Sequence, residues 1–241
     1  MTTPFEIVGI PTDNSILIVA DHASNTVPAN IDLGISQSFL EDHIAYDIGS
    51  AAVSREMALR SGYLAILAGY SRLVVDLNRY PDEEAVIPLR SDGVEIPNNL
   101  LDLPDRVDRI DRYFKPYHQR VAQLIADIRP SLVVALHSFT PKLRSNPQLE
   151  RPWDVGVMYN DYETAPRMAL QFLEEEQLVV GDQLPYSGKD LNATMNRQAE
   201  AIGQPYIGIE IRQDHITEEK GQKRFAEILI RVCNKIQTGL A

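Results

Sequence analysis

Four polar segments, each at the end of an apolar run or directly after one, contain the residue types that hydrolytic chemistry requires. They begin at Asp21-His22, Asp76, His137 and Glu210. Neutral imidazoles bind borderline divalent cations such as zinc, and a catalytic zinc site keeps one position open for water. A carboxylate that does not bind the cation can take a proton from that water and return it to a leaving amine. These residues therefore predict metal-assisted hydrolysis, with His22 and His137 as ligands and Glu210 as the general base.

Two arginines in the same segments, Arg79 and Arg212, indicate the kind of substrate. The planar guanidinium group binds carboxylates through two hydrogen bonds, so these residues favour an acidic substrate or product. The alternative is that they neutralise neighbouring acids in salt-bridge networks, and the sequence leaves both interpretations open. Ser138 adjoins His137 and is expected among the substrate-binding residues. The chain has no Gly-x-Ser-x-Gly motif, which disfavours a nucleophilic serine.

The elements that must position these side chains follow from the apolar pattern. Short aliphatic runs occupy residues 16–20, 63–67, 73–77, 132–136, 155–158 and 206–211. Helical periodicity is present within residues 38–60, 121–128 and 225–236. Buried strands that alternate with helices predict an α/β fold with a central, mostly parallel (mixed) sheet, in a single domain over residues 1–241. Because parallel strands end at one edge of a sheet, the four polar segments are expected to converge there.

The composition limits the partners. The 241 residues include 23 basic and 34 acidic side chains, a net charge of −11, and no basic cluster that would bind nucleic acid. A single cysteine, Cys233, excludes an intrachain disulfide. The N-terminal residues do not resemble a signal peptide and no apolar run is long enough to span a membrane, so we expect a soluble cytoplasmic protein. The oligomeric state stays open, as does the question of whether the loop-like segment 80–104 closes over the site.

Four motifs resemble those of the N-formylglutamate amidohydrolase family. In chain order they are DHASNTVP, SRLVVDLNR, LHSFTP and IGIEIRQD, and the resemblance extends over about residues 16–236. The same ordered residues are distantly similar to the zinc carboxypeptidase and aspartoacylase arrangement. This similarity implies a three-layer α/β/α fold of the zinc-carboxypeptidase/phosphorylase-hydrolase type.

The resemblance also implies roles for individual residues. In the distant relatives a His-x-x-Glu motif and a later histidine hold the metal, a strand glutamate acts as base, and an Asn-Arg pair binds the α-carboxylate of the substrate. By position, these roles fall on His22 and His137 for the metal, Glu210 for the base, and Asn78 with Arg79 for the carboxylate, with Arg72 and Arg212 as further contacts. The implied cofactor is a divalent metal, zinc or alternatively cobalt.

The third metal ligand does not follow from the motif. Where the relatives have His-x-x-Glu this chain has Asn25, whose amide oxygen is a weaker zinc ligand than a carboxylate. Asp47 is the stronger candidate, because it falls on the apolar side of the helix predicted over residues 38–60, where an unpaired acid is costly. Its alternative role is an i,i+4 surface pair with His43. Asp21 is a candidate to orient the neighbouring imidazole without binding the metal.

These residues and the resemblance together predict a metal-dependent amidohydrolase. Its expected substrate is a small anionic N-acylamino acid, most specifically N-formyl-L-glutamate, which would yield formate and L-glutamate as in histidine catabolism. The alternatives are a related metallopeptidase, a deacylase for other N-acylamino acids, or a non-catalytic carboxylate-binding protein that has lost its cation.

Overall fold

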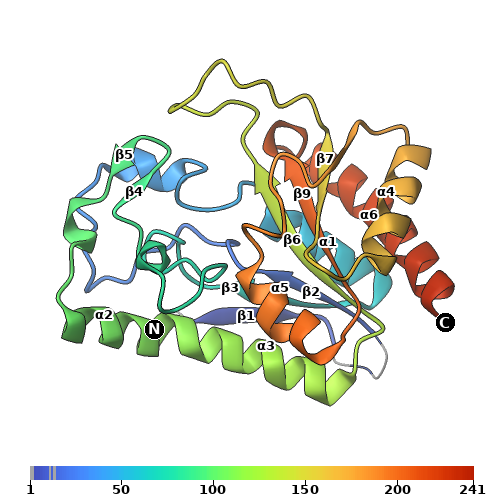
Figure 1. Cartoon of the computed structure of the whole chain (residues 1–241), viewed down its shortest axis with the longest axis horizontal. Coiled ribbons are helices and arrows are strands. Elements are labelled where there is room, and N and C mark those ends of the chain that lie inside the picture. Colours follow the sequence, from blue (N-terminus) through green and yellow to red (C-terminus); the bar gives the residue numbers. More distant parts are fainter. Residues whose placement is uncertain (1–2, 11, 13–14) are drawn as a thin grey trace.

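The computed structural model describes residues 3–10, 12 and 15–241. Its middle layer is a seven-stranded sheet of order β1-β3-β2-β6-β9-β7-β8 (Figure 1). The strands are β1 (Phe5–Val8), β2 (Ile16–Ala20), β3 (Leu64–Ala68), β6 (Leu132–Phe139), β7 (Val155–Met158), β8 (Val180–Asp182) and β9 (Tyr206–Arg212). The central strands β3, β2, β6 and β9 run parallel, whereas β1 and β7 pair antiparallel with β3 and β9. The sheet is therefore mixed and mostly parallel, as predicted.

Helices cover both faces of the sheet (Figure 1). One face carries α1 (Ser50–Ser61), α4 (Thr164–Glu175) and α6 (Glu219–Leu240); the other carries α2 (Leu103–Arg109), a π-helical turn (Ile110–Phe114), α3 (Lys115–Ile128) and α5 (Ala193–Gln198). Val53 and Phe225 are buried in the first of these two cores, and Tyr117 and Val121 in the second. The three-layer α/β/α prediction is confirmed. Within the described residues, no helix combines the length and apolar character that crossing a membrane requires.

A third apolar cluster lies outside the layers and consists of irregular segments. It contains Leu33, Ile44, Leu73 and Ile96. The irregular segments include the hairpin of β4 (Arg90–Ser91) and β5 (Val94–Glu95) and two short helical turns, η1 (Gln37–Glu41) and η3 (Pro97–Asn99). A third turn, η2 (Glu84–Val86), packs Val86 into the core beside α3 instead. The stretch 80–104 therefore has its own local structure.

The strand predicted over residues 73–77 is absent. The backbone N–H of Val74 donates to the carbonyl of Ser71, and that of Asp76 donates to Val86, so the segment is paired in local turns and with η2. Its side chains are nevertheless buried, since Leu73 packs in the third cluster and Val75 in the core beside α3. The apolar run thus reflects burial between two clusters, which periodicity alone cannot distinguish from a buried strand.

The helix predicted over residues 38–60 forms only from Ser50 onward. Gly49 precedes it with φ of 83°, in the left-handed region, and a Cβ there would lie 2.3 Å from the carbonyl oxygen of Ile216. The chain upstream is η1 and irregular backbone. The apolar spacing at Ile44 arises from burial in the third cluster and not from a helix.

Candidate active site

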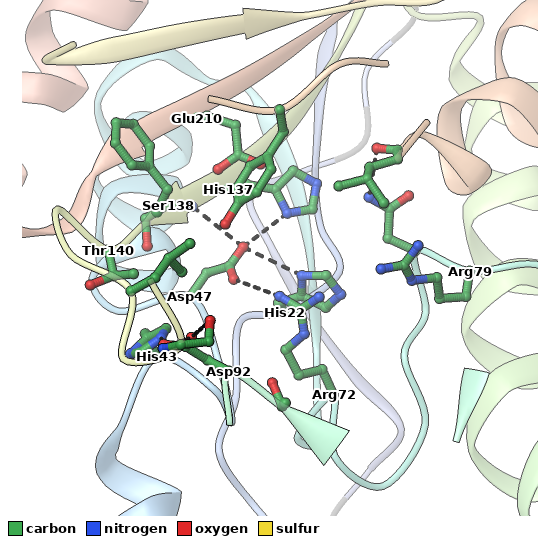
Figure 2. Close-up of a pocket in the computed structure, with 17 residues that line it drawn as sticks. His22, His43, Asp47, Arg72, Arg79, Asp92, His137, Ser138, Thr140 and Glu210 are labelled. Atoms are coloured by element: carbon green, nitrogen blue, oxygen red, sulfur yellow. Dashed lines mark hydrogen bonds and ion pairs between the residues drawn. The ribbon is translucent and has the colours of Figure 1, made fainter. Parts of the chain in front are cut away.

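Three side chains from distant parts of the chain meet at the carboxyl edge of the sheet. His22 follows β2, Asp47 lies in the turn before α1, and His137 is in β6. Nδ1 of His137 is 2.9 Å from Oδ2 of Asp47, and Nδ1 of His22 is 3.5 Å from the same oxygen. Figure 2 shows Asp47 between the two imidazoles. All three side chains are buried.

The parallel pairing of β6 and β9 places the fourth residue. His137 and Glu210 are register partners on these adjacent strands, so their side chains emerge on the same face of the sheet. Glu210 is 6% exposed, and its Oε2 has no hydrogen-bond partner. An unpaired carboxyl oxygen beside two imidazoles at the end of a buried strand is typical of a site that handles protons.

Asp47 is fixed by backbone contacts, although it is not on the predicted helix. Its N–H donates to the carbonyl oxygen of His22 at 2.9 Å, and its Oδ2 accepts from the N–H of Ser138 at 3.3 Å. The predicted pairing with His43 does not form, because the His43 ring contacts Asp42 and Asp92 instead. Asp47 therefore joins the site, for a reason other than the helical spacing that suggested it.

Asp76 orients His22 from the opposite side of the ring. Its Oδ1 is 2.8 Å from Nε2 of His22, and its Oδ2 accepts a hydrogen bond from Nη2 of Arg72 at 2.8 Å. Asp21 does not take this role, because its Oδ1 accepts from the hydroxyl of Tyr117. A carboxylate on Nε2 favours the tautomer that carries its proton there and leaves the lone pair of Nδ1 free.

The donor set fits a divalent cation. Nδ1 of His22 is buried and has no hydrogen-bond partner, yet it faces an oxygen of Asp47. One ligand atom from each of His22, Asp47 and His137 can be chosen so that all lie within 4.8 Å of one another. Tetrahedral zinc with ligands at about 2.1 Å separates them by about 3.4 Å. The structure thus provides two imidazoles and one carboxylate that are close enough together to bind one divalent cation.

The pKa values of these buried groups are shifted by their neighbours in a way that also favours positive charge at this position. Burial and Arg72 would lower the pKa of His22, but Asp76 and Asp47 raise it to about 9. Burial would raise the pKa of Asp47, but the two imidazoles hold it below its ordinary range. Burial raises the pKa of Glu210 to about 7 against the opposing effect of His137. The carboxylates therefore favour positive charge on the imidazoles, which is the same electrostatic environment that a bound cation requires.

Two of the predicted arginines line the pocket and differ in how strongly they are paired. Arg72 contacts Asp76 at 2.8 Å and Asp47 at 3.5 Å. Arg79 reaches Asp76 only at 4.0 Å, and in Figure 2 its guanidinium points toward the imidazoles. Asn78 also lines the pocket, but its Oδ1 accepts a hydrogen bond from the N–H of Thr194. This bond connects Asn78 to the start of α5. Arg79 is therefore the pocket arginine with the greatest capacity for an incoming carboxylate.

Arg212 is not part of the site, contrary to the prediction. Its guanidinium contacts Asp214 at 2.8 Å and the carbonyl of Pro152 at 3.2 Å, and it is not among the residues that line the pocket. The alternative interpretation, a salt-bridge network, is correct for this residue. Ser138 does line the pocket, but its hydroxyl donates to the carbonyl of Ile48 at 2.8 Å and helps to hold the turn that carries Asp47.

Asn25 is not among the residues that line the pocket. The residues on either side of it pair with the segment after β3. Ser24 Oγ donates to the carbonyl of Gly69 at 3.1 Å, and the carbonyl of Thr26 accepts from the N–H of Ser71 at 2.9 Å. This pairing holds Asn25 beside residues 69–71, which leaves Asp47 as the third candidate ligand.

The loop after β6 and the β4–β5 hairpin meet at the mouth of the pocket. Asp92, in the hairpin turn, accepts hydrogen bonds from the N–H and hydroxyl of Ser145 and from the N–H of Arg144, and it contacts His43 at 2.9 Å. The cavity has a volume of about 330 Å³, within the usual range of about 300–1,000 Å³ for small-molecule sites. The segment 80–104, which the sequence predicts to be loop-like, and the loop after β6 therefore both help to enclose the site.

Comparisons with known proteins agree with this architecture. The model of the N-formylglutamate amidohydrolase family matches residues 14–217. The crystal structure of gene product Atu2144 from Agrobacterium tumefaciens has a TM-score of 0.92 at 29% identity, covering 98% of this chain and 95% of that chain. N-formylglutamate amidohydrolase from Ralstonia eutropha has a TM-score of 0.78 at 17% identity, covering 98% of each chain. A bacteriophage poly-gamma-glutamate hydrolase shares the fold with a TM-score of 0.52 at 10% identity, covering 99% of this chain and 91% of that chain.

A comparison with curated proteins gives no match. The family match nevertheless includes every residue of the buried group, from His22 to Glu210. The chain therefore belongs to the N-formylglutamate amidohydrolase family and is a hydrolase that acts on a linear amide bond.

Proposed function

We propose that this protein is a metal-dependent deformylase that converts N-formyl-L-glutamate to formate and L-glutamate. The observation that carries the proposal is the buried group of His22, Asp47 and His137 with the unpartnered carboxyl of Glu210 beside it. His22, Asp47 and His137 would hold the cation, for which zinc is the first choice and cobalt the second. When bound, the cation supplies a Lewis acid that polarises the amide carbonyl and makes water more acidic.

Glu210 transfers the proton. A water oxygen attacks the formyl carbon, the proton of that water moves to Glu210, and Glu210 delivers it to the amino nitrogen as the carbon–nitrogen bond breaks. A carboxyl group can act in both directions when its pKa lies near the working pH, and burial raises the pKa of Glu210 to about 7. The free Oε2 leaves this group available for the task.

Arg79 supplies the charge that selects an acidic substrate. Its weak contact with Asp76, at 4.0 Å, leaves the guanidinium available for the α-carboxylate, while Asn78 holds the adjacent segment. Arg72 adds positive charge to the same pocket. Arg79 thus gives an anionic substrate a local partner in the pocket although the chain as a whole carries −11.

The test is a substrate series on the purified protein with defined metal content. We expect about one zinc or cobalt ion per chain, formate release from N-formyl-L-glutamate, loss of activity on chelation, and recovery when zinc is added back. Acetyl-glutamate, longer acyl-glutamates and small dipeptides serve as competitors. Faster hydrolysis of any competitor would overturn the formyl assignment, and full activity after complete metal removal would overturn the metal dependence.

A further inference from the structure

Arg151 is a buried cation that has no acidic partner among the described residues. It is 5% exposed, and Nη1 donates to the carbonyl oxygen of Thr140 at 2.7 Å. Its Nε is buried and has no hydrogen-bond partner. Burial of an unpaired charge is unfavourable, so such a residue is retained only where its surroundings compensate it or its function requires it.

Two aromatic rings supply the compensation. The Cζ atom of Arg151 is 4.8 Å from the ring centre of Tyr186 and 5.3 Å from that of Phe139. These distances allow cation–π attraction to both rings. Tyr186 and Phe139 line the active-site pocket and Arg151 does not, so the guanidinium supports the pocket wall from behind.

Tyr186 lines the same pocket as Glu210, Arg72 and His137, and its side chain carries an O–H group. Burial raises the pKa of its hydroxyl, and the charge of Glu210 acts in the same direction, so the hydroxyl keeps its proton near neutral pH. Arg72 and Arg151 act in the opposite direction. Because Tyr186, Glu210 and Arg72 line one cavity of about 330 Å³, a substrate bound beside Glu210 lies within reach of the Tyr186 side chain.

We propose that Tyr186 is a catalytic hydrogen-bond donor to the carbonyl oxygen of the substrate, and that Arg151 positions it. Negative charge develops on that oxygen as water adds, and a donor that is already oriented stabilises the transition state without reorganisation. Tyr186 donates a hydrogen bond and keeps its proton, so the proton transfer through Glu210 is unchanged. This inference rests on the proposed hydrolase mechanism, and it adds one residue that touches substrate and one that acts through it.

The experiment is a double-mutant cycle on the metal-loaded enzyme, with formate release as the readout. We expect Tyr186→Phe to lower kcat on the order of 10²-fold with KM within about twofold, as for the loss of one oxyanion donor. Arg151→Met, which keeps an apolar chain between the rings, is expected to lower kcat by about tenfold. In the Tyr186→Phe background it should cost no more than about twofold, because its effect passes through Tyr186.

The chain offers a matched control pair outside the pocket. Arg167 lies over the ring of Tyr159 with Cζ at 5.3 Å from the ring centre, and neither residue lines the cavity. Tyr159→Phe and Arg167→Met should leave kcat and KM within about twofold. If Arg151→Met does not fold, Arg151→Lys enters the same cycle under the same criterion, and Tyr186→Phe alone still tests the donor role.

Three results separate the hypotheses. A wild-type enzyme that releases no formate from N-formyl-L-glutamate contradicts the proposed function and not this inference, which is then tested on the amide that the enzyme does cleave. If the wild type is active and the kcat of Tyr186→Phe lies within threefold of the wild-type value, the donor role is overturned. An Arg151 substitution that costs as much in the Tyr186→Phe background as alone overturns the positioning role.

Discussion

Replacement of Glu210 by glutamine is expected to lower activity and to raise stability at the same time. The amide has nearly the shape of the carboxyl group, so the pocket is preserved while proton transfer is lost. A positioned acid–base group contributes about 10²–10⁴-fold, so kcat should fall by at least about 10²-fold, or about 3 kcal/mol of barrier. The metal content of the variant should equal that of the wild type.

The stability change follows from the buried carboxyl. Its pKa rises from 4.5 to about 7 on folding, so the unfolded chain releases this proton at lower pH than the folded chain does. The group therefore destabilises the fold progressively as pH rises from 4.5 to about 7, and the penalty persists above that pH. In metal-free protein it amounts to about 1 kcal/mol at pH 5.5 and about 3 kcal/mol at pH 8.

Thermal unfolding of metal-free wild type and Glu210→Gln at these two pH values measures the effect. The Tm of Glu210→Gln should exceed that of the wild type by about 4–8 °C more at pH 8 than at pH 5.5. This follows because a change of about 2 kcal/mol in the free energy of unfolding corresponds to roughly that shift in a chain of this size. Glu175→Gln, an exposed residue paired with Lys235 at 2.7 Å, is the control and should leave kcat unchanged. A difference in Tm that is equal at both pH values would refute the burial argument, and near-normal kcat would remove Glu210 from the mechanism.

Four further substitutions test the remaining assignments. Asp47→Asn should reduce bound zinc to below about 0.1 equivalent by elemental analysis, whereas Asn25→Ala should retain a full equivalent; the reverse outcome would exchange their roles. Asp76→Asn should weaken zinc binding by about 10–100-fold in a competition titration, because it removes the carboxylate that orients the ligand ring. Arg79→Ala should raise KM by about 10–100-fold with little change in kcat, as expected for a lost charged hydrogen bond. Arg212→Ala should leave KM unchanged and lower Tm; an increase in its KM would restore it to the site.

The parts of the site that lie on strands could be predicted from the sequence. His137 and Glu210 stand at the ends of continuous apolar runs, and in-register parallel pairing requires that such residues share an edge and a face. His22 follows β2 by two residues and is placed by the same logic. The apolar runs that predict strands therefore indicate both the fold class and the side chains that meet at the carboxyl edge of the sheet.

The supporting residues could not be predicted in this way, because irregular segments position them. The sequence singles out Asp76 by its place after an apolar run, yet its role depends on a turn at residues 73–77 that has the composition of a strand. The apolar spacing places Asp47 on a helix that does not extend that far, and its actual position depends on backbone contacts with His22 and Ser138. Periodicity describes regular backbone, so it carries no information about such contacts.

The contact between Arg151 and Tyr186 could not be predicted from the sequence either. Both lie in irregular segments, after β6 and after β8, and nothing in their spacing relates one to the other. Only the folded chain shows that a cation without an acidic partner lies against the tyrosine of the pocket wall. Strands can place the ligands and the base, but the selection of one oxygen atom on the substrate requires donors held at fixed angles around it. In this chain the proposed donor lies in an irregular segment, and the contact of Arg151 with the Tyr186 ring, 4.8 Å from Cζ to the ring centre, is what we expect to fix its orientation.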